Sequence, residues 1–236
     1  MNAGEYQLVG LTDDLSQVST VEDIIDLVEF RFGEAKDPYG QISNYDGDTP
    51  IIVSDVVNQV NSSEEQEKAL YNIVSEQPAD KIKTVEFELS VAKENEHIVR
   101  KFQKESASTV ISYYNVEETP TEQRLQNIIS NCSQYGDIAK IVVRAETETD
   151  ALSLLQCLNA ASRQGIDVAG YALGDIGKHT RVISIFYGAQ MAYAPIAGYE
   201  GSSDTEEIDL RLLQNLLKTL INSESATLID ELQGKF

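Results

Sequence analysis

A single lysine stands inside an apolar run of mostly β-branched residues, "IAKIVV", at positions 138–143. Such a run is typical of a strand buried on both faces, so we expect Lys140 to be buried with it. Apolar surroundings lower the pKa of an amine, and a neutral amine attacks ketones to form an imine. A protonated imine withdraws electrons, so a nearby base can remove a proton from the neighbouring carbon. Aldol cleavage and β-elimination of water are reactions of this kind.

Further charged and phenolic side chains gather at the carboxyl ends of other predicted strands. These are Glu29 and Arg31 in "VEFRF", Glu86 and Glu88 in "VEFEL", and Tyr113 and Tyr114 in "ISYY". Structural ion pairs, such as one between Lys140 and Glu88, are the alternative interpretation. An isolated buried ion pair stabilises a fold poorly, because the desolvation of both charges offsets their attraction. A group of charges at one level therefore favours a reaction site.

The loop "GDIGKHTR" at 174–181 adds a possible anion site. Gly174 and Gly177 would let backbone N–H groups approach a ligand, and Arg181 can donate two hydrogen bonds to a carboxylate or phosphate. Together with Lys140, this loop indicates a keto acid or keto phosphate as the ligand.

Eight short apolar segments alternate with longer amphipathic ones, which predicts a (β/α)8 barrel, with a doubly wound open sheet as the alternative. The predicted strands are 6–10, 27–32, 50–54, 84–89, 109–114, 138–143, 167–173 and 190–195. The predicted helices are 19–28, 62–77, 95–105, 119–136, 147–165, 178–188 and 204–223. In a barrel, reactive groups lie at the carboxyl ends of the strands.

The length of 236 residues suits one barrel domain over 1–222, followed by a helix or tail over 223–236. The net charge of −21 disfavours nucleic acid and anionic membranes as partners, which bind clustered Lys and Arg. Such an excess is typical of an acidic cytosolic protein or of one kept soluble in high salt. No segment is long and apolar enough to span a membrane and no secretory signal is present, so we expect a cytoplasmic protein.

The two cysteines and two histidines have no metal-site spacing, so we expect neither a metal nor another cofactor.

Six motifs in chain order resemble type I 3-dehydroquinate dehydratase, the imine-forming lyase of the shikimate pathway. They are "DLVEFRF", "VEFEL", "VISYYNVEETP", "DIAKIVV", "GYALGDIGKHTRV" and "YGAQMAYAP". The first of them, together with the acidity, resembles haloarchaeal members in particular. The resemblance implies a (β/α)8 barrel that dehydrates 3-dehydroquinate, with homodimers common in the family.

The resemblance also assigns roles to five residues. It implies that Lys140 forms the imine and that Glu88 sits beside the catalytic pair. It further implies that Glu29 and Arg31 line the substrate site and that Arg181 holds the substrate carboxylate.

The family's catalytic histidine is replaced by Tyr114. A phenol, whose pKa is about 10, accepts protons poorly at pH 7, and general acid–base catalysis contributes about 10² to 10⁴-fold. His179 in the nearby loop is a candidate substitute. Three other substrate-contacting positions also depart from the family pattern, because Val56, Glu200 and Asp204 occupy them. The alternative hypothesis is therefore a paralogue that lost dehydration and binds a small molecule or regulates.

Overall fold

The computed structural model describes residues 6–54, 81–104, 108–197, 199 and 208–221. Its eight parallel strands form one sheet in the order β7-β6-β5-β4-β3-β2-β1-β8. A bridge between Val168 and Ala189 joins β7 to the segment before β8, so the sheet closes into the predicted barrel and the open sheet is excluded. The strands are β1 Gln7–Thr12, β2 Leu27–Arg31, β3 Ile51–Ser54, β4 Ile82–Glu88, β5 Ser108–Asn115, β6 Ile138–Arg144, β7 Asp167–Leu173 and β8 Met191–Pro195.

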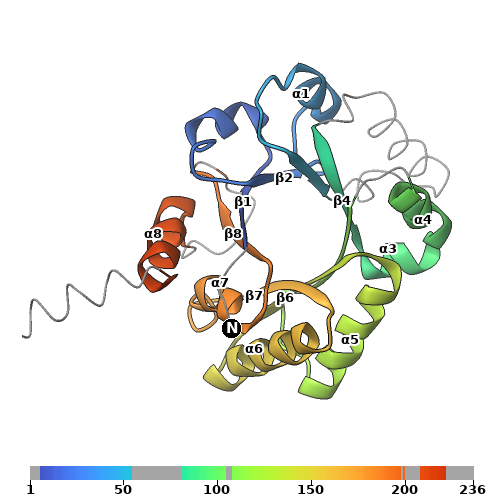
Figure 1. Ribbon diagram of the computed structural model, residues 1–236, viewed down its shortest axis with the longest axis vertical. Helices are drawn as coiled ribbons and strands as arrows, with labels where there is room; N and C mark the ends of the chain where they lie inside the picture. The colour runs from blue at the N-terminus through green and yellow to red at the C-terminus, as the bar shows by residue number, and fades with distance from the viewer. Residues whose placement is uncertain (1–5, 55–80, 105–107, 198, 200–207, 222–236) are drawn as a thin grey trace, which may run out of the picture.

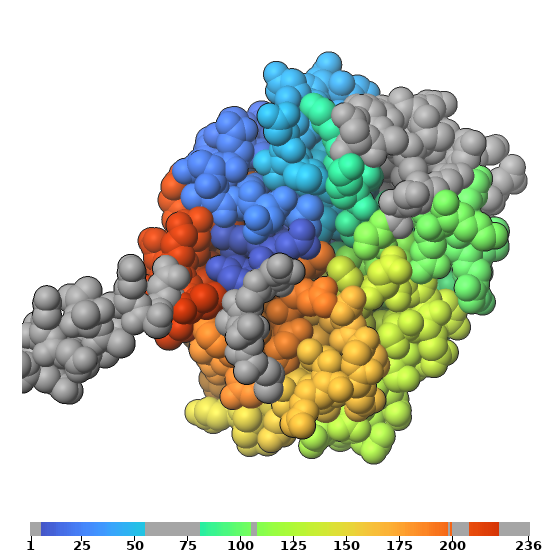
Figure 2. All heavy atoms as spheres, in the orientation of Figure 1, coloured from blue at the N-terminus to red at the C-terminus, as the bar shows by residue number. Residues whose placement is uncertain are grey.

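The helices of the described residues lie outside this barrel (Figure 1). They are η1 Leu15–Thr20, α1 Pro38–Asn44, α3 Leu89–Glu94, α4 Glu96–Lys104, α5 Glu122–Tyr135, α6 Glu148–Arg163, α7 Thr180–Ile183, η3 Ser184–Tyr187 and α8 Leu210–Ile221. Figure 2 shows the coloured segments following one another around the molecule in chain order, with α8 beside the N-terminal segments. Helix α8 thus completes the ring of helices around the barrel.

The predicted helix over 19–28 is wrong. The chain instead forms the short 3-10 helix η1, which begins earlier because the Asp14 side chain accepts a hydrogen bond from the Ser16 N–H. The sequence pattern also failed to predict α1, where Asp37 caps the helix and Pro38 occupies its first turn. The predicted helix over 178–188 divides into α7 and η3, and the helix predicted over 62–77 and the tail over 223–236 lie outside the described residues.

Alternation along β6 decides where the lysine points. Ala139, Ile141 and Val143 belong to the core between the sheet and the helices, whereas Ile138 and Val142 belong to the apolar cluster inside the barrel. Because successive side chains of a strand point to opposite faces, Lys140 points into the barrel between these two.

Within the described part of the chain, no helix is both long and apolar enough to cross a membrane.

The net charge of −21 leads to a prediction about salt. We expect the unfolding temperature to rise by several degrees between 0.1 M and 2 M KCl at pH 7, because salt screens repulsion among exposed carboxylates. Differential scanning calorimetry measures this. The control is the same series near the sequence pI of about 4.3, where protonated carboxyl groups should leave a smaller salt dependence. An unfolding temperature independent of KCl at pH 7 would contradict the prediction.

Candidate active site

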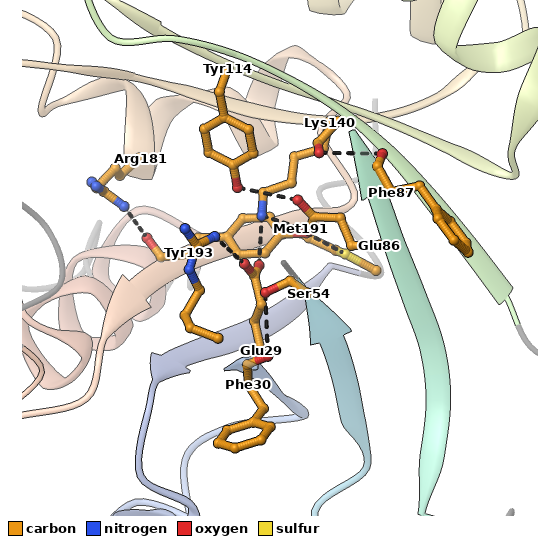
Figure 3. A network of polar contacts seen from close by, with 12 residues as sticks. Glu29, Phe30, Ser54, Glu86, Phe87, Tyr114, Lys140, Arg181, Met191 and Tyr193 are labelled. Atoms are coloured by element: carbon orange, nitrogen blue, oxygen red, sulfur yellow. Dashed lines mark hydrogen bonds and ion pairs between the residues drawn. The ribbon is translucent and has the colours of Figure 1, made fainter. Parts of the chain in front are cut away.

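Lys140 is fully buried between two carboxylates inside the barrel (Figure 3). Its Nζ lies 2.6 Å from Oε2 of Glu29 on β2 and 2.9 Å from Oε2 of Glu86 on β4. Glu29 is also fully buried, and Glu86 is 5% exposed. The rings of Tyr114 and Tyr193 lie beside the ammonium group, with centroids 5.3 Å and 4.5 Å from Nζ. The amine is therefore held in a closed, charged and aromatic environment.

The two carboxylates reverse the expected pKa shift of the lysine. Burial alone lowers the pKa of Lys140, but the negative charges of Glu29 and Glu86 outweigh burial and hold it well above its ordinary value. The prediction of a lowered pKa for Lys140, which considered only the apolar walls, is therefore wrong. The amine must pass a proton to a neighbour before it can act as a nucleophile.

The two glutamates differ in how easily they accept that proton. Burial raises the pKa of both, but for Glu29 the charges of Lys140 and Arg31 outweigh burial, so its pKa lies below the ordinary value. The pKa of Glu86 is raised, by burial first and then by the charge of Glu29, which Lys140 offsets only in part. Glu86 is therefore the more basic carboxylate of the pair.

Arg31 connects Glu29 to the mouth of the barrel. Its Nη1 lies 3.2 Å from Oε1 of Glu29, and its Nη2 lies 3.1 Å from Oε1 of Glu34. The other oxygen of Glu34 accepts a hydrogen bond of 2.8 Å from the hydroxyl of Tyr199, in the segment after β8. The structure thus brings Glu29 and Arg31 to Lys140, as the sequence predicts. Sequence reasoning missed Glu34 and Tyr199.

Tyr114 also belongs to the group of residues around Lys140. Its hydroxyl donates a hydrogen bond of 3.3 Å to Oε1 of Glu86, whose other oxygen contacts Lys140. Burial, and then the charge of Glu86, raises the pKa of Tyr114 well above its usual value. The side chain is therefore a neutral phenol at pH 7, able to donate one proton toward Glu86.

Glu88, predicted to lie beside the lysine, does not do so. Its side chain is exposed and accepts a hydrogen bond from Ser90, and Glu86 occupies the predicted place. The strand register explains the error, because Glu88, Ser112 and Lys140 are aligned along one hydrogen-bonding row. In a barrel tilted by about 36°, two strand spacings of about 4.8 Å displace such a row by about 6 Å along the axis. That displacement is about two residues of a strand, the step from Glu88 to Glu86.

This correction gives a test by substitution. We expect Glu88→Gln to change Lys140-dependent chemistry by less than about threefold, because its exposed charge is screened by solvent. The measurement is the rate of imine trapping by borohydride with a carboxylate-bearing ketone. A loss as large as that caused by Glu29→Gln would show that Glu88 acts at the lysine.

Arg181 on α7 is buried and lies against the barrel's aromatic side chains. Its guanidinium carbon is 3.8 Å from the ring centroid of Tyr171, and its Nη1 donates a hydrogen bond of 3.0 Å to the carbonyl of Tyr193. The preceding Thr180 hydroxyl accepts a hydrogen bond from the Ala172 N–H, which docks α7 against β7. Arg181 is thus fixed on the side of the barrel built by β7 and β8.

The glycine loop before Arg181 is built differently from the predicted anion site. Gly174 has a φ of +85°, and a side chain at Gly177 would meet the Leu173 carbonyl oxygen at 2.5 Å, so the tight turn needs both glycines. The N–H groups of Gly177 and Lys178 donate to the carbonyl of Gly174. These two groups therefore close the turn and do not point at a ligand.

The remaining candidates lie elsewhere or outside the described residues. His179 is exposed, with its ring hydrogen-bonded to the Ile176 carbonyl, so it does not reach the lysine cluster. Val56, Glu200 and Asp204 lie outside the described residues.

Two tyrosines of the site were missed by sequence reasoning. Tyr171 and Tyr193 lie in the predicted strands 167–173 and 190–195 and are not among the predicted site residues, although both point inward with the apolar cluster of the barrel interior. The alternation of inward and outward positions along β7 and β8 is the sequence signal that could have identified these two tyrosines.

Comparison with known proteins decides the family. The family model described as type I 3-dehydroquinase matches residues 10–224. The chain belongs to the type I 3-dehydroquinase family.

Haloarchaeal relatives match most of this chain. A protein named 3-dehydroquinate dehydratase from Haloquadratum walsbyi is 30% identical over 93% of this chain and 94% of the relative. One of the same name from Halobacterium salinarum is 25% identical over 85% and 91% of the two chains. The expected family and its haloarchaeal likeness are therefore confirmed.

Solved structures agree on the fold. The 3-dehydroquinate dehydratase from Geobacillus kaustophilus has a TM-score of 0.79 at 21% identity, over 92% of this chain and 91% of its own. The type I 3-dehydroquinate dehydratase from Clostridium difficile with covalently modified comenic acid has a TM-score of 0.78 at 16% identity, over 92% and 93% of the two chains.

Proposed function

We propose that this protein is a 3-dehydroquinate dehydratase that forms an imine between Lys140 and the substrate ketone. The observation that carries the proposal is a fully buried lysine held between two carboxylates inside the barrel of a type I 3-dehydroquinase. The activity named for the Haloquadratum walsbyi and Halobacterium salinarum relatives supports the same substrate.

The proposed reaction has three stages. The Lys140 amine attacks the ketone carbon, and loss of water leaves a protonated imine. Removal of a proton from the adjacent carbon gives an enamine, which expels the hydroxyl of the next carbon as water and forms a conjugated double bond. Hydrolysis of the imine then releases the enone and restores the amine.

Two cations are placed to orient the substrate. Arg31 lies beside Glu29 at the mouth of the barrel, and Arg181 lies on the side built by β7 and β8. Guanidinium groups bind carboxylates through paired hydrogen bonds, so Arg181 would hold the substrate carboxylate after releasing the Tyr193 carbonyl. Arg31 would bind a hydroxyl group of the ring.

A second function is favoured by the phenol at position 114. Because Tyr114 is a poor proton acceptor, a paralogue that binds or modifies another carboxylate-bearing ketone without dehydrating it would show the same site. Such a protein would still form an imine through Lys140.

One assay separates these functions. Purified protein in high salt is given 3-dehydroquinate, and the conjugated product is followed by ultraviolet absorbance. In parallel, borohydride reduces any imine and mass spectrometry locates the adduct. We expect both product and an adduct on Lys140.

Each result of the assay has a distinct meaning. An adduct without product would favour the second function and reject dehydration. Neither adduct nor product would reject the imine chemistry of both functions for this substrate.

A further inference from the structure

We propose that Glu86 is the proton carrier of this site, with Tyr114 as the relay between its carboxylate and the leaving hydroxyl group. This inference rests on the proposed dehydratase function. It assigns to a carboxylate the proton transfers that a histidine performs in the family pattern, from which this chain departs at Tyr114.

The geometry places Glu86 between the two groups it would serve. Its Oε2 lies 2.9 Å from Nζ of Lys140, and its Oε1 accepts the Tyr114 hydroxyl at 3.3 Å. Figure 3 shows Tyr114 and Lys140 converging on this one carboxylate. Direct proton transfer requires heavy atoms within about 2.6–3.2 Å, with longer contacts common before substrate binds. The contact between Glu86 and Lys140 lies within that range, and the contact between Glu86 and Tyr114 is slightly longer.

Glu29, the other buried carboxylate, is less suited to this role. It contacts both Lys140 and Arg31, and these two cations hold its pKa below the ordinary value. At Glu86, burial and the negative charge of Glu29 outweigh the neighbouring cations and raise the pKa, which makes it the better proton acceptor. Glu29 therefore stays ionised and keeps the cations in place, while Glu86 exchanges protons.

The first proton transfers form the imine. The Lys140 ammonium gives one proton to the Glu86 carboxylate, and the neutral amine attacks the ketone. After a proton moves from nitrogen to oxygen, the resulting carbinolamine takes the proton of the Glu86 carboxylic acid and loses water. The products are a protonated imine, one water molecule and the Glu86 carboxylate, so protons and charge balance.

The second pair of transfers eliminates water. The Glu86 carboxylate takes the proton from the carbon next to the imine, and the C–H electrons form the enamine double bond. The enamine then expels the hydroxyl group of the following carbon. The Tyr114 hydroxyl gives this leaving group its proton and receives the proton of Glu86 in return. Glu86 ends as a carboxylate and Tyr114 as a neutral phenol, ready for imine hydrolysis.

The pH dependence of product formation is a direct consequence. Among the described residues, the charged and titratable groups that face Glu86 are Lys140 on β6, Glu29 and Arg31 on β2, Tyr114 on β5 and Tyr193 on β8. Among them Glu86 is the carboxyl group with a raised pKa, so it becomes protonated first as the pH falls. We expect the turnover number to fall on the acid side as Glu86 is protonated, and no histidine-like limb at neutral pH.

The test compares Glu86→Gln with the wild-type protein and with Glu96→Gln, an exposed carboxylate of α4. The readouts are the borohydride adduct on Lys140, the exchange of substrate hydrogen with deuterated solvent, and product absorbance. We expect Glu86→Gln to form the adduct more slowly, because Glu86 accepts the Lys140 proton, and to lose at least about 10²-fold in hydrogen exchange and product, within the range of general acid–base catalysis. Glu96→Gln should match the wild type.

Tyr114→Phe tests the relay separately. It should preserve hydrogen exchange, because Glu86 still removes the proton, but slow product formation by about tenfold, below the full general acid–base contribution of about 10² to 10⁴. Equal losses in exchange and product would overturn the relay and make Tyr114 part of proton removal.

The outcomes separate this inference from the proposed function. Absence of adduct and product in the wild type rejects the function. A wild-type adduct with product, together with an unchanged product rate in Glu86→Gln, overturns the inference alone. If circular dichroism shows that Glu86→Gln does not fold, Glu86→Asp decides. An unchanged rate with the shorter acid overturns the proposal, and a loss of about tenfold or more supports it.

Discussion

Lys140→Met is expected to remove the borohydride adduct completely and to reduce product formation to the uncatalysed level. Imine formation needs a primary amine, and the thioether side chain has none. The substitution also removes the Lys140 ammonium from the buried Glu29 and Glu86, and breaking such a buried ion pair typically lowers the free energy of unfolding by about 3–5 kcal/mol. Mass spectrometry and urea denaturation at pH 7 measure the two effects.

Lys140→Arg is the matched control, because a guanidinium keeps the positive charge but stays protonated and forms no imine. We expect it to lose the adduct while keeping more of the stability than Lys140→Met. The stability deficit of Lys140→Met should shrink as the pH falls from 7 to 4, because protonation of the two glutamates removes their repulsion. An adduct that persists in either variant would place the imine on another lysine.

Tyr114→His is expected to raise the rate of dehydration by about 10²-fold, the lower end of the general acid–base contribution. An imidazole at this position would point from β5 toward the group of residues around Lys140 and, unlike the phenol, would accept a proton at pH 7. Steady-state kinetics should show the gain in kcat with a small change in KM. A new limb near the ordinary pKa of histidine, about 6.5, should appear in the pH profile.

A Tyr114→Gln variant controls for the loss of the phenol ring, since an amide hydrogen-bonds without exchanging protons at neutral pH. It should not gain activity. If Tyr114→His also shows no gain while forming the adduct, we infer that Val56, Glu200 or Asp204, at positions where the family resemblance implies substrate contacts, limits the reaction instead.

The sequence predicted the barrel because its strands are buried on both faces and read as continuous apolar runs. The helices were harder to predict where side-chain caps determine the residue at which they begin. Asp14 and Asp37 start η1 and α1 through side-chain hydrogen bonds to nearby backbone N–H groups, which leave no periodic pattern in the sequence. The long amphipathic helix α6 was predicted well, because a capping box and a buried leucine face both mark it.

The candidate site was predicted in part for similar reasons. Lys140, Glu29 and Arg31 stand out as charges on the inward positions of apolar strands, and the structure brings them together. The choice between Glu86 and Glu88 depends on strand tilt, which no local pattern encodes. The direction of the lysine pKa depends on two distances across the barrel, so sequence reasoning about apolar walls gave the wrong sign.

The four charged groups inside the barrel affect how fast an anionic ligand binds. Glu29 and Glu86 balance Lys140 and Arg31, so the formal charges of these four groups cancel inside a chain of net charge −21. The net negative charge of the rest of the chain repels an anion that approaches from solution. At the site itself, the four charged groups carry no net charge and do not repel it. Concentrated salt screens this repulsion, because the Debye length falls to about 3 Å at 1 M. Bimolecular capture should therefore be faster in brine than in dilute buffer, the reverse of an enzyme that attracts its ligand electrostatically.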